Sequence, residues 1–223
     1  MPDRVERPPQ CLPRELDVAV IGGGLVGASL ALGLSGTGVR VLLVESVAPD
    51  SAAQPSFDER TTALGNASRR IFQGLGVWDA LEPEAARIRT IHVSDAGRFG
   101  CARLVAREQG IEAFGFVIPN RVIGAALWRG LASARGIELK APARIEGLQI
   151  TADGAGFTVV TESGSRETFV SKLVVAADGA HSLVRAAAGI ETGVEDYEQV
   201  AIAAPVVSDR PHDGTAYERF TPS

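Results

Sequence analysis

"LDVAVIGGGLVGASLALGLSGTGVRVLLVES", residues 16–46, is the stretch of sequence that decides the fold. The apolar run from Val18 to Ile21 predicts a buried strand, and the pattern from Leu25 to Leu34 is typical of a helix. The stretch Gly36-Thr37-Gly38 ends that helix, and a second strand follows from Val39 to Val44. A strand, a helix and a second strand in this order predict an α/β fold with a parallel sheet.

Three glycines between the first strand and the helix complete a G-x-G-x-x-G spacing. Gly22 permits a tight turn, Gly24 lets the backbone approach a pyrophosphate, and Gly27 lets the helix and strand pack closely. Leu25 and Val26 lie inside the motif, at the helix N-terminus, whose partial positive charge favours the pyrophosphate. The spacing predicts a dinucleotide site, and a purely structural glycine turn is the alternative.

An acidic residue follows the second strand. Glu45 lies about 20 residues after the glycines and can accept hydrogen bonds from both hydroxyls of an adenosine ribose. A 2′-phosphate would be repelled at that position. The pattern does not distinguish FAD from NAD, because both carry the same adenosine and pyrophosphate.

The composition excludes several classes of protein. The 223 residues are 45% hydrophobic and 22% charged, with a net charge of −5, which argues against a nucleic-acid partner. Cys11 and Cys101 lack metal or redox spacing, which indicates a reducing compartment. No apolar run approaches the roughly 18 residues of a membrane span, and the first residues lack the core of a signal peptide. We therefore expect a cytoplasmic protein with a flexible tail over residues 1–15.

The middle of the chain predicts a helix over residues 61–75, preceded by a loop that contains Asp58 and Arg60. That loop can reach back to the nucleotide, although a solvated ion pair between the two side chains is the alternative. A mainly apolar stripe predicts the core face of the helix and its extension: Leu64, Ala67, Ile71, Phe72, Leu75, Trp78 and Leu81. Later elements are an antiparallel sheet within 88–118, a helix over 120–135, strands at 137–140 and 143–151, and a hairpin or meander formed by 156–161 and 167–172.

"KLVVAADGAHSLVR", residues 172–185, predicts a strand covered on both faces that ends at Asp178-Gly179. Ligands of doubly wound sheets lie at the carboxyl ends of the strands, so Asp178 is expected at the same crevice as the glycine motif. An acid there can bind hydroxyl groups, and Gly179 allows close approach of the backbone.

A combination of motifs points to one family. They are the glycine motif, Glu45, residues 58–64, "GVWDAL", "HVSDAG", Asp178-Gly179 with Ser182 and Arg185, and "YERFTP". Together they resemble the FAD-dependent aromatic hydroxylases related to para-hydroxybenzoate hydroxylase. Within that family the chain is most similar to the N-terminal portion of the ubiquinone-biosynthesis hydroxylases, of the 2-octaprenyl-6-methoxyphenol hydroxylase type. The resemblance spans residues 16–222.

The resemblance implies roles for particular residues. Asp178 would be associated with both FAD and the reducing nicotinamide cofactor, and Arg121 would contact the flavin at the start of a helix. Arg60 would also contribute to cofactor binding. The residues predicted to bind the cofactor are Gly22, Gly24, Leu25, Val26, Gly27, Glu45, Arg60, Arg121, Asp178 and Gly179. We name no catalytic side chain, and we predict no metal ligand.

The resemblance also implies an activity. NADPH or NADH would reduce FAD, and the reduced flavin would use O2 to hydroxylate an aromatic ring, while the protein orients the flavin and excludes water. The expected substrate is a small phenol in ubiquinone biosynthesis, prenylated and derived from the membrane. Peripheral association with the inner membrane or with other enzymes of the ubiquinone pathway would accompany such a substrate. A NAD-dependent dehydrogenase and a non-catalytic dinucleotide-binding fragment are the alternatives.

The expected domain organisation follows from the same resemblance. Residues 16–87 and 120–192 would form a Rossmann-like FAD-binding domain with a parallel sheet and a β-meander. Residues 88–119 and 193–223 would form an incomplete substrate-binding domain with part of an antiparallel sheet. The last segment predicts strands "EQVAIAAPVV" and "GTAYERFTP", with no later partner strand. We therefore expect a truncated fragment that holds FAD weakly and lacks hydroxylase activity.

Overall fold

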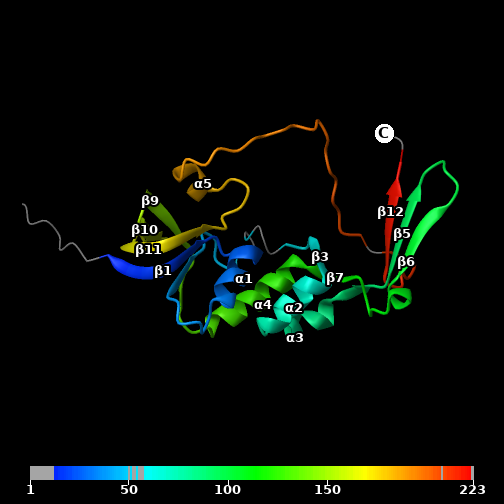
Figure 1. Ribbon diagram of the computed structural model, residues 1–223, viewed down its shortest axis with the longest axis horizontal. Coiled ribbons are helices and arrows are strands. Elements are labelled where there is room, and N and C mark those ends of the chain that lie inside the picture. The colour runs from blue at the N-terminus through cyan, green and yellow to red at the C-terminus, as the bar shows by residue number, and fades with distance from the viewer. Residues whose placement is uncertain (1–12, 50, 52–53, 55–57, 207, 222–223) are drawn as a thin grey trace, which may run out of the picture. The chain divides into compact units, whose positions relative to one another are not determined.

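The computed structural model describes residues 13–49, 51, 54, 58–206 and 208–221. By its internal contacts the chain divides into two compact units, Met1–Gln54 with Leu131–Glu195, and Pro55–Gly130 with Asp196–Ser223. Figure 1 shows the elements of both units. The predicted division into an FAD-binding and a substrate-binding domain places residues 58–87 and 120–130 differently, and it stays a prediction.

A six-stranded sheet forms the first unit, in the order β8-β2-β1-β11-β10-β9. Strands β8, β2, β1 and β11 are parallel, whereas β9, β10 and β11 form an antiparallel meander. The α/β fold with a parallel sheet and a β-meander is thus confirmed. The elements are β1 (Arg14–Ile21), α1 (Leu25–Gly33), β2 (Val41–Val44), β8 (Ile137–Lys140), β9 (Ala143–Thr151), β10 (Gly154–Thr161), β11 (Arg166–Ala176) and α5 (Leu183–Ala187).

Apolar side chains of the central strands form the core of this unit. Val20, Leu42 and Phe169 are fully buried, as expected for strands with covered faces. Phe157 stacks on Phe169 with the ring centroids 6.0 Å apart. Strand β1 begins at Arg14, so the predicted flexible tail is wrong for residues 14 and 15, because both pair with β11. Residues 1–12 of that tail lie outside the described residues.

The predicted strand before Asp178 is the second half of the long strand β11. Its pairing with β10 ends at Ser171, and beyond that point β1 is its paired neighbour. Leu173 is 55% exposed, so the prediction that both faces of this strand are covered is wrong in the described chain.

Two three-stranded sheets and the helices α2, α3 and α4 belong to the second unit, with orders β3-β7-β4 and β12-β5-β6. Strands β5 and β6 form the predicted antiparallel hairpin, and β12 joins β5 in the parallel direction. Trp78 and Phe116 pack edge to face in the core at 5.1 Å. The elements are β3 (Thr61–Gly65), α2 (Asn66–Gly74), α3 (Trp78–Leu81), η1 (Glu82–Glu84), β4 (Ala86–Ile88), β5 (Thr90–Asp95), β6 (Cys101–Val105), η2 (Ala106–Gln109), β7 (Gly115–Pro119), α4 (Asn120–Ala132, whose last two residues fall in the first unit) and β12 (Thr215–Phe220).

Two sequence predictions fail in this unit. Residues 61–65 form β3 rather than the start of a helix, because the β-branched pair Thr61-Thr62 finds a partner strand in β7. The predicted apolar stripe is therefore only partly buried, and Ile71 is 61% exposed. Residues 198–206 form no strand, and Ile202 is 93% exposed. A strand needs a neighbour for its backbone hydrogen bonds, and no described segment pairs with these residues.

Candidate functional site

The loop between β1 and α1 is shaped by close backbone contacts. Gly22 has φ +105, a conformation that favours glycine, and a Cβ atom there would lie 2.3 Å from the carbonyl oxygen of Ala177. A Cβ atom on Gly27 would lie 1.9 Å from the carbonyl oxygen of Gly22 and 3.1 Å from the Cβ of Ala177. The first and third glycines therefore let the loop, the helix and the end of β11 meet. Ala177 is part of this contact, which the sequence motif did not reveal.

The N-terminus of α1 fits an anionic group. Its first intrahelical hydrogen bond runs from the N–H of Ala28 to the carbonyl of Gly24, so the N–H groups of the first turn have no partner within the helix. No side chain caps this end, and no acidic residue lies in the first turn. Val26 in that turn is 75% exposed. Backbone donors and the helix dipole together make such an end suitable for a pyrophosphate.

Glu45 is a buried carboxylate that holds two loops in place. Its Oε2 accepts a hydrogen bond of 2.6 Å from the N–H of Gly23 in the glycine loop. Its Oε1 accepts bonds from the N–H of Val47 at 2.8 Å and the hydroxyl of Ser46 at 3.2 Å. A carboxylate offers about four acceptor sites, so about one acceptor site on Oε2 is left for a ligand hydroxyl. The prediction that Glu45 binds the ribose hydroxyls stays a prediction.

Asp178 lies against the glycine loop and caps α5. A Cβ atom on Gly22 would lie 2.8 Å from the backbone nitrogen of Asp178, so the two predicted nucleotide motifs are in contact. The Asp178 carboxylate accepts hydrogen bonds from the hydroxyl of Ser182 and from the N–H groups of Leu183 and Val184, the last two at 2.8 and 3.2 Å. Gly179 has φ +85 and open space around its Cα atom.

The same segment contains a second cap. Ser182 accepts a hydrogen bond of 2.9 Å from the N–H of Arg185, and the Arg185 side chain donates to the carbonyl of Ala180 at 2.8 Å. The pattern D-G-x-x-S-x-x-R thus describes a self-contained turn and helix cap. The spacing of Asp, Ser and Arg is the signal that could have predicted this role.

The two predicted arginines lie together in the second unit. Arg60 forms an ion pair with Asp58, and the Nε atom of Arg121 lies 2.9 Å from a carboxylate oxygen of Glu59. The loop is joined to the start of α4, because the N–H of Arg121 donates to the carbonyl of Asp58 at 3.1 Å. The other residues predicted to bind the cofactor, those of the glycine loop with Glu45, Asp178 and Gly179, lie in the first unit.

Burial opposes ionisation of Asp58, but hydrogen bonds from Arg60 lower the pKa of this carboxyl below its usual range. A hydrogen bond from the Asn120 side chain also lowers this pKa. The N–H of Asn120 donates to the carbonyl of Arg60 at 2.8 Å, and its Oδ1 accepts from the hydroxyl of Thr62 at 2.6 Å. Sequence reasoning missed Asn120.

Among the described residues, no three His, Cys, Asp or Glu side chains come together in a way that could hold a metal ion. No helix in the described ranges is long and apolar enough to cross a membrane.

Comparison with known proteins finds ubiquinone hydroxylases among the relatives. Ubiquinone hydroxylase UbiL of Rhodospirillum rubrum is 35% identical over 93% of this chain and 47% of its own length. The 3-demethoxyubiquinol 3-hydroxylase of Escherichia coli is 32% identical over 92% of this chain and 52% of its own. The chain thus spans about half the length of the curated relatives it matches.

Solved structures share the fold. The p-nitrophenol 4-monooxygenase PnpA of Pseudomonas putida superposes with a TM-score of 0.65 at 23% identity, over 79% of this chain and 44% of that one. The flavin-dependent monooxygenase PieE, solved with FAD and substrate, gives a TM-score of 0.63 at 25% identity, over 80% of this chain and 33% of that one. The sequence matches the FAD binding domain family over residues 15–217. The resemblance to FAD-dependent hydroxylases is therefore confirmed, and the chain belongs to the FAD binding domain family.

Proposed function

We propose that this chain is the FAD-binding part of a flavin-dependent monooxygenase that hydroxylates an aromatic substrate, a prenylated phenol of ubiquinone biosynthesis. NADPH or NADH and O2 are the co-substrates. The observation that carries the proposal is the contact of the glycine loop with the start of the Asp178-Gly179 segment, which joins two nucleotide motifs in one unit. The names of the relatives support the substrate class.

The residues of the first unit fit the adenosine and pyrophosphate of FAD. The uncapped N-terminus of α1 would hold the pyrophosphate, and the remaining acceptor site of Glu45 would take one ribose hydroxyl. Close approach of the backbone at Gly179 suits the same ligand, since open space surrounds this residue. Arg60 and Arg121 would contribute donors to the flavin. FAD, when bound, supplies the redox chemistry.

Asp178 would act mainly through its backbone. Its carboxylate has three donors within the protein, so only about one of its four acceptor sites, on Oδ1, is left for a cofactor. The cap fixes the turn at Gly179, and this turn would lie beside the cofactor. We propose that Asp178 orients this turn for FAD and the nicotinamide.

Flavin binding tests the proposal directly. The purified chain, supplied with FAD, should show the visible absorption of a bound flavin, and titration should quench flavin fluorescence. Replacement Gly27→Ala should abolish binding, because the added Cβ would collide with the carbonyl of Gly22 at 1.9 Å. The control Gly74→Ala adds a methyl group in open space at the end of α2 and should bind FAD like the parent.

The alternatives give different results. A NAD-dependent dehydrogenase would bind NAD without visible colour, and a non-catalytic fragment would bind FAD but would not support hydroxylation in the longer protein. Hydroxylation is measured as phenol product formed per NAD(P)H consumed. Product formation that needs no flavin would refute the proposal.

A further inference from the structure

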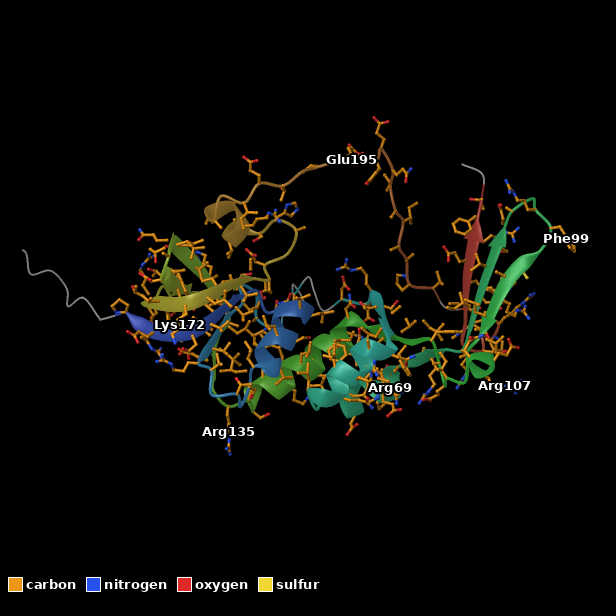
Figure 2. The ribbon with its side chains drawn as sticks, in the orientation of Figure 1. Arg69, Phe99, Arg107, Arg135, Lys172 and Glu195 are labelled. Carbon is orange, nitrogen blue, oxygen red and sulfur yellow. The ribbon has the colours of Figure 1, made fainter. Side chains whose placement is uncertain are left out.

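The β5–β6 hairpin carries a fully exposed aromatic side chain. Phe99 lies in the turn between the two strands, with a relative exposure of 109%. Gly97 and Gly100 flank the tip with φ +80 and +101, so the backbone there is held in a tight turn that suits glycine. Figure 2 shows Phe99 projecting outward from the tip of the hairpin. Phe99 therefore adds nothing to the packing of the described chain.

The segment that contains the hairpin and its base, residues 89–111, is basic in an acidic chain. Residues 89–111 contain four arginines and two acidic residues, whereas the whole chain has a net charge of −5. Arg98, beside Phe99, pairs with Asp95 at 3.1 Å, and its side chain is still 81% exposed. Arg103 on β6 is exposed and forms no ion pair with any described residue. The members of this set are Arg89, Arg98, Arg103, Arg107, Asp95 and Glu108.

An aromatic tip flanked by cations fits the surface of an anionic lipid bilayer. Apolar aromatic side chains enter the boundary between headgroups and acyl chains, and nearby arginines attract anionic headgroups. Arg103 is four residues from Phe99, about 13 Å along a strand. Arg107 lies at the base of the hairpin, farther from the tip (Figure 2). Arg98 and Arg103 are thus the cations that can reach the headgroups when Phe99 is inserted.

We propose that the β5–β6 hairpin is a membrane contact in which Phe99 inserts into the bilayer surface and Arg98 and Arg103 bind anionic headgroups. The biological purpose rests on the proposed function, because a prenylated phenol is dissolved in the bilayer and the enzyme must meet the bilayer to collect it. The contact itself depends only on the hairpin.

Vesicle sedimentation tests the contact without FAD. The chain should bind phosphatidylcholine vesicles that contain about a quarter phosphatidylglycerol, and should bind pure phosphatidylcholine more weakly. Phe99→Ser should weaken binding about tenfold, because an aromatic side chain no longer leaves water. Arg103→Gln should weaken it about fivefold. The matched control Arg107→Gln should change binding less than about twofold, because Arg107 lies at the base of the hairpin, farther from the inserted tip than Arg103.

A fluorescent variant reports the insertion itself. The chain has two native tryptophans, Trp78, which is 2% exposed, and Trp128. In Phe99→Trp, the emission that exceeds that of the parent chain should be blue-shifted with anionic vesicles and quenched by brominated lipids. Unshifted emission, or undiminished binding of Phe99→Ser, would overturn the proposal. A loss of self-association in Phe99→Ser, with no effect on vesicle binding, would assign the tip to contact between copies and also overturn it.

The two proposals fail separately. A protein that binds flavin and hydroxylates a phenol but ignores vesicles would refute the membrane contact alone. A protein that binds vesicles through Phe99 but never takes up flavin would refute the proposed function alone.

Discussion

Replacement of Asp178 by Ala should release the start of α5. The change removes the acceptor of three hydrogen bonds, two from the backbone N–H groups of Leu183 and Val184 and one from the hydroxyl of Ser182. Loss of a capping side chain costs about 1 kcal/mol, with a range of about 0.5–2 kcal/mol. Because the lost acceptor is charged, we expect the upper half of that range, about 1–2 kcal/mol.

The expected loss is local, so a local measurement is needed. A change of about 1–2 kcal/mol corresponds to about 5–30-fold faster amide exchange through the open state. Hydrogen exchange followed by mass spectrometry on peptides over residues 180–188 would measure it. Val184, at 5% exposure, anchors this helix in the core of the first unit, so opening of α5 also exposes an apolar side chain.

Two further variants separate the cap from a direct role in cofactor chemistry. Asp178→Asn keeps an oxygen acceptor and a favoured capping residue, and should retain most of the exchange protection. Ser182→Ala removes the second cap and should speed exchange like Asp178→Ala. If Asp178 acts through the cap, reduction of the flavin by NAD(P)H should follow the exchange data across the three variants. Slow reduction in Asp178→Asn with normal exchange protection would refute this reasoning and assign the charge a direct role.

Three other predictions concern the same unit. Glu45→Ala should weaken FAD binding by about 1.5–3 kcal/mol, the value of one hydrogen bond to a charged group. Flavin fluorescence titration measures the affinity for FAD, and an affinity equal to that of the parent in a folded variant would contradict the ribose contact. Gly27→Ala should lower the free energy of unfolding by more than about 2 kcal/mol in denaturant titration, because the Cβ overlaps the backbone of Gly22, while Gly74→Ala should have little effect. The hydrogen bond from Lys140 lowers the pKa of Glu167, burial opposes this effect, and Arg14 adds to the lowering. The ionised Glu167 therefore stabilises the fold. This stabilisation is full above the ordinary pKa of 4.5 and is lost as the pH falls through the lower pKa of the folded state. Glu167→Gln should remove up to about 1 kcal/mol of that acid sensitivity, and an unchanged pH profile of stability would argue against the ion pairs.

The parallel half of the first unit could be predicted from sequence because each signal was local. Glycine spacing, an apolar run and the acid at the end of the second strand lie within 31 residues that fold as one βαβ unit. The start of the second unit could not be predicted in this way. Residues 61–65 carry a helix-like pattern, but β7, more than 50 residues later, offers them a partner strand. Long-range pairing overrides local preference, and a single window of sequence does not contain it.

The difference between local signals and long-range contacts also explains which parts of the site could be predicted. The glycines were predicted because their task is set by the backbone, and the structure places Gly22 and Gly27 at contacts that no larger residue fits. The roles of Glu45 and Asp178 were only half predicted, because an acid at a strand end can bind a ligand or the protein itself, and sequence does not show which donors surround it. Here both carboxylates are engaged by the backbone: Glu45 by the glycine loop, and Asp178 by the first turn of α5. Each acid therefore builds the surface that the cofactor would meet, and about one acceptor site on each carboxylate, on Oε2 of Glu45 and on Oδ1 of Asp178, is left to touch it.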